Sequence, residues 1–186
     1  MRIEKLKVEH NVKVEWVHFP LHPETPSEGR ALAALFGGRD ADRQARHAQM
    51  KARMEAEGLP YGERSMTYNS RLAQELGKWA DTQPGGAALH DALFRAYFVE
   101  ARDISQPAVL LEIAARVGLS VDGAREVLEK RTFSTAVDAD WELSRQYGIT
   151  GVPTFVIGQY GVVGAQPYEA LAGLVRKAAP AGKPEE

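Results

Sequence analysis

The 186-residue chain contains no cysteine. Its residues therefore cannot form a disulfide, hold a metal through thiolates or supply a cysteine nucleophile. Long apolar runs are also missing, so no segment reaches the length needed to cross a bilayer. The charged N-terminal segment MRIEKLKVEH lacks the apolar core of a signal peptide. These absences predict a cytoplasmic protein that does not associate with membranes.

The chain also lacks a marked excess of charge of either sign. It has 23 Lys and Arg against 25 Asp and Glu, which gives a formal net charge of −2. No overall positive field is present to attract nucleic acid, and we expect no nucleic-acid partner. Hydrophobic residues make up 44% of the chain, which is enough to bury the core of one domain.

Familiar catalytic and metal-binding motifs are missing as well. His18 and His22 are four residues apart, but Pro20 lies between them and excludes a metal-binding pair on one helix face. No serine stands in a nucleophile elbow, and no glycine pair precedes the Lys-Ser or Lys-Thr of a phosphate loop. We therefore assign no catalytic residue and no metal site, and we expect all five histidines to be solvated or hydrogen-bonded: His10, His18, His22, His47 and His90.

The apolar pattern predicts an α/β chain with a long helical block. Residues 12–19 alternate apolar and polar side chains, which indicates a strand that Pro20 ends. Residues 154–157 form an apolar run, followed by a predicted turn at 158–161 and a partner strand that begins at 162–163. Periodicity, capping residues and helix stops predict eight helices. The first is at 2–10 and the last at 168–178. Between them, one spans 40–57, one begins at 69 or 70, one begins after 86, one spans 107–118, one begins at 120, and one ends before Gly148.

This order of elements predicts a discontinuous organisation. The helical block interrupts an α/β core, and the Pro- and Gly-rich C-terminus is expected to be disordered. The predicted parts are the N-terminal core 1–39, the helical insertion 40–132, the C-terminal core 133–179 and the tail 180–186.

Pro153 stands where the chain leaves a loop and enters an apolar strand. Gly151 lies two residues before it, the β-branched Val152 lies directly before it, and a hairpin follows. This context is typical of the cis-proline loop of thioredoxin-like folds. In such a loop the backbone N–H and C=O of Val152 turn outward and can pair with an extended peptide or glutathione. An ordinary trans proline at a strand edge is the alternative.

Four segments carry a resemblance to a known family: HFPLHPETP (18–26), GLPYGERSMTYNSRLAQELGKWAD (58–81), LHDALFRAYF (89–98) and GITGVPTFVIGQYGVVGAQPYEAL (148–171). They resemble DsbA-family thioredoxin-like proteins of the FrnE-like subgroup, which is related to 2-hydroxychromene-2-carboxylate isomerases and kappa-class glutathione transferases. The resemblance implies a thioredoxin-like fold with an inserted all-helical domain and strand order 2-1-3-4. Residues 12–19 then correspond to the second strand.

Members of this family begin with a strand and a helix that carries Cys-Pro-Trp-Cys or a near variant. Met1–Leu6 resembles the end of that helix, so the first strand is expected to be absent from this chain. The absent strand would be central, and its loss would leave unpaired backbone groups. We therefore expect Met1 to be an internal or misassigned start.

The resemblance implies a thiol–disulfide oxidoreductase whose redox cysteines are missing from this chain. It assigns substrate binding to Gly151, Val152, Pro153 and Thr154. Gln166 stands where glutathione-binding relatives carry an acidic residue, which does not favour glutathione binding here. Asn69 resembles an asparagine that relatives place over the site, and an N-cap of the following helix is its alternative role.

Two other functions remain open at this point. The first is a glutathione-dependent isomerase or transferase, in which a serine replaces the first cysteine. The second is a non-catalytic module that captures a peptide or small ligand with the cis-proline loop. The expected partner is a thiol- or disulfide-containing protein or a small molecule, a homodimer is an allowed assembly, and no cofactor is expected apart from glutathione as a co-substrate.

Overall fold

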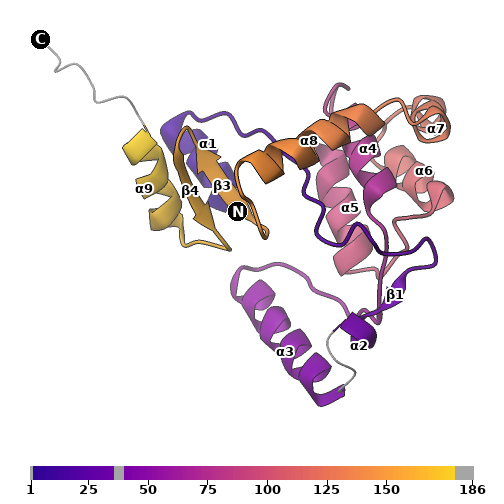
Figure 1. Cartoon of the computed structure of the whole chain (residues 1–186), viewed down its shortest axis with the longest axis horizontal. Coiled ribbons are helices and arrows are strands. Elements are labelled where there is room, and N and C mark those ends of the chain that lie inside the picture. The colour runs from indigo at the N-terminus through magenta and orange to yellow at the C-terminus, as the bar shows by residue number, and fades with distance from the viewer. Residues whose placement is uncertain (1, 36–39, 179–186) are drawn as a thin grey trace, which may run out of the picture. The chain divides into compact units, whose positions relative to one another are not determined.

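The structure is a computed structural model, and it describes residues 2–35 and 40–178 (Figure 1). The chain forms two compact units, which we describe separately. The first unit combines the residues up to Leu21 with those from Asp140 onward, and the second extends from His22 to Ala139. The predicted insertion, 40–132, falls within the second unit, and its limits stay a prediction. The predicted disordered tail, 180–186, lies outside the described residues.

The first unit is built around an antiparallel hairpin. Strands β3 (Thr154–Ile157) and β4 (Tyr160–Val163) pair in a register that places Thr154 opposite Val163 and Ile157 opposite Tyr160. The predicted turn at 158–161 is therefore two residues too long. Only Gly158 and Gln159 connect the strands, and Gly158 has a φ of 59°, as the turns of tight hairpins require.

Two helices complete the core of the first unit. Helix α9 (Tyr168–Ala178) packs on the hairpin, and α1 (Arg2–His10) packs on α9. Both helices were predicted from the sequence. Leu6 of α1 and Leu171 and Ala172 of α9 are buried, and they are surrounded by partly buried apolar residues: Ile3, Val12, Phe155, Val162, Tyr168 and Val175.

The predicted strand at 12–19 is wrong, because this segment has no regular secondary structure. A strand needs a neighbour to complete its hydrogen-bond ladder. In the described part of the chain, β3 pairs with β4 alone, and the expected sheet order 2-1-3-4 is not formed. Other contacts hold the segment. The His18 N–H donates to the Asp140 carboxylate (2.9 Å), and Val12 packs against the core. Trp16 remains half exposed.

The second unit is mainly helical. A short ribbon pairs Arg30 with Thr67 and Ala31 with Met66, and it was not predicted because two-residue strands show no periodicity. The elements of this unit are β1 (Arg30–Ala31), α2 (Leu32–Leu35), α3 (Asp40–Ala56), β2 (Met66–Thr67), α4 (Arg71–Ala80), α5 (Ala88–Phe98), α6 (Pro107–Arg116), α7 (Val121–Lys130) and the start of α8 (Ser134–Gln146).

The predicted helices of the block, α3 to α8, are confirmed. Local signals place their ends: Pro107 is the first residue of α6, and the Ser120 hydroxyl accepts from the Gly123 N–H (3.1 Å) at the start of α7. The core lies among α4 to α7, and its largest fully buried apolar side chains are Leu76, Leu89, Leu110 and Ile113.

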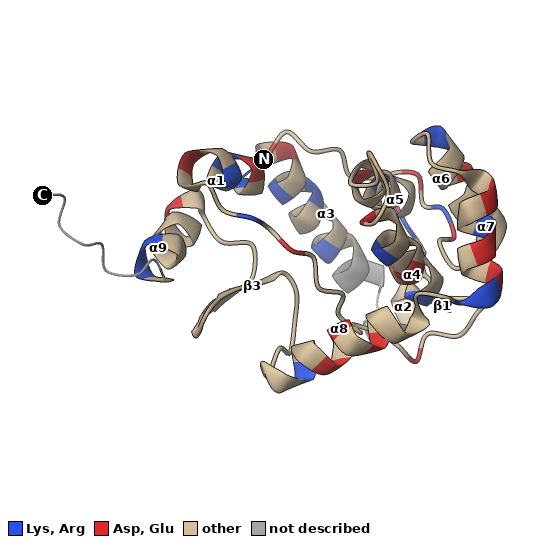
Figure 2. Cartoon of the chain, turned by 90° about the horizontal axis from the view of Figure 1, so that it is seen from above, with Lys and Arg blue, Asp and Glu red and all other residues tan. Residues whose placement is uncertain are grey.

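Charged residues of both signs cover the helices. Figure 2 shows acidic and basic residues interspersed on α7 and α8, as expected for solvated helix faces. Among the residues that the structure describes, no helix is both long and apolar enough to cross a bilayer.

Candidate functional site

The loop 151–154 lies at the end of the connection from α8 to β3, and Thr154 is the first residue of β3. The Val152–Pro153 peptide bond is cis, which confirms the prediction from its sequence context. Two hydrogen bonds hold the loop on either side of Val152. The Pro153 C=O accepts from the Gly164 N–H (2.7 Å), and the Thr154 hydroxyl donates to the Gly151 C=O (2.7 Å). Gly151 and Thr154 therefore stabilise the loop conformation.

Val152 is left accessible by this arrangement. The residue is 51% exposed. Neither its backbone N–H nor its C=O makes a hydrogen bond with any described residue. One unpaired donor and one unpaired acceptor on the same exposed residue are what an extended chain needs in order to pair with it.

Gln166 is linked to this loop indirectly, through the end of β4. Its side-chain amide N–H donates to the Val163 C=O (2.6 Å), next to Gly164, whose N–H reaches Pro153. The Arg2 guanidinium donates to the Gln166 C=O (2.9 Å) and so connects α1 to the segment before α9. Gln166 thus belongs to the same local structure as the loop, and its role in binding stays a prediction.

Asn69 belongs to the second unit, whereas the loop belongs to the first. Its Oδ1 accepts from the Arg71 N–H (2.9 Å), and its Nδ2 donates to the Thr25 C=O (2.8 Å). Ser70 occupies the N-cap position of α4, but its side chain makes no capping hydrogen bond. Asn69 therefore satisfies the first turn of α4 in its place. A contact between Asn69 and a substrate stays a prediction.

The loop carries no acid–base chemistry of its own. No titratable side chain occurs between Gly148 and Gln159. In the described ranges, no three His, Asp or Glu side chains are grouped so that they could hold a metal ion. The geometry therefore supports binding of a ligand backbone and offers no nucleophile at the loop.

The sequence reasoning missed a buried charge cluster in the second unit. Glu75 is fully buried in α4 and is bonded to Arg71 and Arg131. Burial favours the neutral carboxyl, but hydrogen bonds from Arg131 and Arg71 outweigh it and hold the pKa of Glu75 below its usual value. The spacing of Arg71 and Glu75, four residues apart, was the one available signal. The Glu75 carboxylate is thus bonded to two arginines of its own unit, which indicates a structural role.

Residues 1–176 match the family described as the DSBA-like thioredoxin domain. The chain belongs to this family. Its fold is accordingly a DsbA-like thioredoxin fold, mostly helical with few strands, and the finer FrnE-like assignment stays a prediction. A comparison with curated proteins gave no match.

Two solved structures are similar to the chain. A probable DsbA oxidoreductase from Streptomyces coelicolor is 29% identical, with a TM-score of 0.88 over 100% of this chain and 85% of that chain. A putative protein disulfide isomerase from Nitrosomonas europaea is 16% identical, with a TM-score of 0.62 over 95% of this chain and 87% of that one. The second match supports the fold alone.

Family membership and composition together limit the chemistry of the chain. Thiol–disulfide exchange needs an attacking thiolate, and the 186 residues contain no thiol. These residues by themselves therefore do not support the disulfide exchange of the DsbA family.

Proposed function

We propose that this DsbA-family chain is the substrate-binding part of a thiol–disulfide oxidoreductase of the FrnE-like subgroup. In this account it binds an extended polypeptide through the backbone of Val152. The observation that carries the proposal is the exposed Val152, whose N–H and C=O have no hydrogen-bond partner among the described residues. The likeness to a probable DsbA oxidoreductase supports the choice of class.

The loop is suited to bind a polypeptide without reading its side chains. A ligand strand that pairs with both backbone groups of Val152 gains one donated and one accepted hydrogen bond. The bonds from Gly164 to Pro153 and from Thr154 to Gly151 hold the loop before the ligand arrives. Less conformational entropy is then lost on binding. Substrates would therefore be unfolded or extended segments of varied sequence.

The redox step needs a dithiol that these residues lack. In that step a thiolate attacks one sulfur of the substrate disulfide, a mixed disulfide forms, and the other substrate sulfur leaves as a thiolate. A second thiolate then attacks the mixed disulfide, which releases the reduced substrate and leaves the protein dithiol oxidised. The chain's own part is to hold the substrate backbone beside Val152.

A non-catalytic binding module is the second candidate, and the absence of cysteine favours it. It uses the same contacts at Val152 and omits the redox step. A glutathione-dependent isomerase or transferase has less support, because position 166 carries a glutamine whose amide N–H already donates to Val163.

Peptide binding tests what the two leading candidates share. The probe is reduced and alkylated insulin B chain carrying a fluorophore, followed by anisotropy. Val152→Pro removes the backbone N–H, and Val152→Ala is the matched control that keeps it. We expect Val152→Pro to weaken binding about tenfold and Val152→Ala to change it about twofold or less. Equal affinities for wild type and Val152→Pro, with unchanged circular dichroism, would overturn the proposal.

Insulin reduction separates the two candidates. The 186-residue chain is expected to be inactive, because it has no thiol. A second protein carries a strand–helix segment with Cys-Pro-Trp-Cys joined ahead of residue 1. It should reduce insulin if the Val152 loop binds the substrate beside a dithiol. Peptide binding without any gain of reduction would assign the chain to the binding modules.

A further inference from the structure

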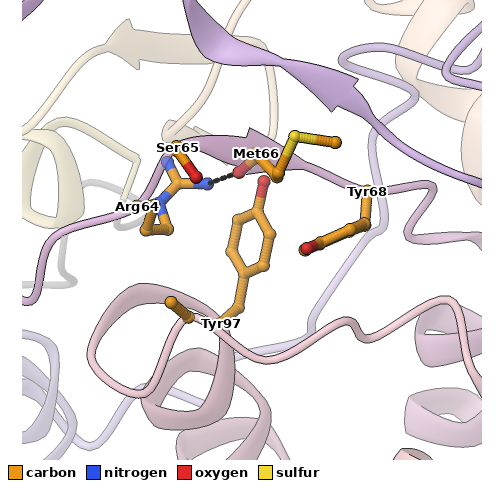
Figure 3. Close-up of a pocket in the computed structure, with 6 residues that line it drawn as sticks. Arg64, Ser65, Met66, Tyr68 and Tyr97 are labelled. Atoms are coloured by element: carbon orange, nitrogen blue, oxygen red, sulfur yellow. Dashed lines mark hydrogen bonds between the residues drawn. The ribbon is translucent and has the colours of Figure 1, made fainter.

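The second unit contains a pocket that is distinct from the Val152 loop. Six residues line it: Arg64, Ser65, Met66, Tyr68, Tyr97 and Ala101. Figure 3 labels the first five. The lining residues come from the segment around β2 and from the end of α5 and the residues after it. The space between the lining atoms is about 220 Å³, a figure that includes open solvent, so the enclosed part of the pocket is much smaller. We infer that this pocket binds a small organic carboxylate, with Arg64 as the residue that recognises the charge.

Arg64 is a partly buried cation that has no acidic partner among the described residues. Its guanidinium carbon lies 4.3 Å from the ring centroid of Tyr97 and 4.9 Å from that of Phe98. Within the described part of the chain, its Nη1 makes a long hydrogen bond to the Met66 C=O (3.4 Å), and its buried Nε has no partner. No carboxylate of the described residues forms an ion pair with it. Stacking on the rings offsets part of the cost of burial, and an anion bound to the guanidinium would offset more of it.

The other lining groups suit an anion with an apolar body. The hydroxyls of Ser65 and Tyr68 make no hydrogen bond within the described chain, so they can donate to a ligand. The Tyr97 hydroxyl shares a hydrogen bond with Thr67 (2.8 Å), which fixes its ring. Figure 3 shows this ring between Arg64 and Tyr68, with its hydroxyl end directed toward the strand that carries Met66.

Local charges also favour an anion. Among the residues that the structure describes, no Asp or Glu lines the pocket. Glu100, which follows α5, is already engaged by Arg95 (3.3 Å) and Arg116 (3.2 Å). An entering carboxylate therefore meets Arg64 without a lining acid to repel it or to compete for the guanidinium.

The shape of the cation and the apolar lining select a carboxylate over inorganic phosphate. A planar guanidinium can donate two parallel hydrogen bonds to a carboxylate, and the Met66 thioether and tyrosine rings can contact an apolar body. All the groups involved belong to the second unit. The inference therefore goes beyond the proposed function and does not depend on it.

Sodium benzoate is the probe, with benzyl alcohol as its neutral counterpart and inorganic phosphate as a separate arm. Isothermal titration calorimetry measures the affinity of the 186-residue chain for each. We expect benzoate to bind and benzyl alcohol to bind at least about tenfold more weakly, because the charge-assisted contact is lost. Tighter binding of phosphate than of benzoate, or no benzoate binding, would overturn the inference.

Two variants test whether Arg64 recognises the charge. Arg64→Met keeps an apolar stem over the rings and removes the guanidinium, whereas Arg125→Met removes the same charge from an exposed position on α7. We expect Arg64→Met to weaken benzoate binding about tenfold or more and Arg125→Met to leave it unchanged. Equal losses in both variants would contradict the inference. If Arg64→Met does not fold, NMR of the wild type decides: benzoate must shift the Arg64 Nε–H and Tyr97 ring signals, and shifts elsewhere alone would refute the site.

Discussion

Arg131 donates to both carboxylate oxygens of Glu75, from Nε to Oε2 and from Nη2 to Oε1, at 2.7 Å each. Arg71 adds a third hydrogen bond from its Nε to Oε1, also at 2.7 Å. Glu75 is fully buried in α4, while Arg131 lies at the C-terminal end of α7. This one carboxylate therefore connects two helices of the second unit, and its removal would take from Arg131 and Arg71 the charged acceptor that they share.

Glu75→Gln is expected to destabilise the second unit. The substitution keeps the shape of the side chain but removes the negative charge that balances the two arginines. We expect the free energy of unfolding to fall by about 3 kcal/mol. Urea denaturation followed by circular dichroism measures the change. Glu126→Gln is the matched control, because Glu126 pairs with Lys130 on an exposed face of α7 and should show little change. Equal effects of the two substitutions would contradict the account.

The same cluster predicts a loss of stability in acid. The pKa of Glu75 in the folded chain lies below its ordinary value of 4.5, because the hydrogen bonds from Arg131 and Arg71 outweigh the effect of burial. The folded state therefore binds fewer protons than the unfolded state. The contribution of Glu75 is present above its unfolded pKa and is lost as the pH falls through the folded value. Urea midpoints measured against pH should fall more steeply in acid for wild type than for Glu75→Gln. Parallel curves would exclude Glu75 as the group responsible.

Gly86 and Gly173 are expected to respond oppositely to alanine. A Cβ at Gly86 would lie 1.7 Å from the Ala80 carbonyl oxygen, which is backbone and cannot move aside cheaply. Gly173 lies within α9, and a Cβ there meets only the end of Arg176, at 3.9 Å. Gly86→Ala should lower the unfolding free energy by about 3 kcal/mol or prevent folding. Gly173→Ala should raise it by about 0.5–1 kcal/mol. Thermal unfolding shows whether each substitution raises or lowers stability. An unchanged stability in Gly86→Ala would contradict the close approach of Gly86 to the Ala80 carbonyl oxygen.

Tyr168 is expected to ionise at unusually high pH. Its hydroxyl donates to the Glu9 carboxylate, and this hydrogen bond raises the pKa of Tyr168 to about 12. Glu9→Gln should lower that pKa toward the ordinary value of 10.0. Spectrophotometric titration measures tyrosinate, and subtraction of the Tyr168→Phe curve isolates this residue. An unchanged Tyr168 titration in Glu9→Gln would show that the hydrogen bond does not control its ionisation.

Helices were predictable because their signals are local. Pro107 at the start of α6 and Ser120 before α7 act within one helical turn, so the sequence alone places them. The predicted strand at 12–19 was wrong because strand formation depends on a partner that is remote in sequence. The alternation of apolar and polar side chains indicates an extended chain with two different faces. It contains no information about a neighbouring strand, which a β-strand needs for its hydrogen bonds. The pairing of Arg131 with Glu75 was equally invisible, since the two residues are remote in sequence.

At the candidate site too, features set by neighbouring residues were predictable and those set by remote residues were not. The cis bond at Pro153 was predictable from its immediate neighbours. The internal hydrogen bonds of Gln166 and Asn69 were not, because they depend on Val163, Thr25 and Arg71. The stacking of Arg64 on Tyr97 likewise depends on how β2 and α5 come together, and no motif in the sequence marks it.

The central claim is that the Val152 backbone binds an extended polypeptide. The most direct test is the amide resonance of Val152 in ¹⁵N-labelled protein, titrated with reduced and alkylated insulin B chain. The account predicts that this amide shifts and becomes protected from hydrogen exchange as the peptide binds. It also predicts no such protection when the peptide is N-methylated at alternate residues, because that peptide lacks the N–H that would donate to the Val152 C=O and its methyl groups keep the two backbones apart. Peptide binding that leaves the Val152 amide unshifted and unprotected would contradict the account.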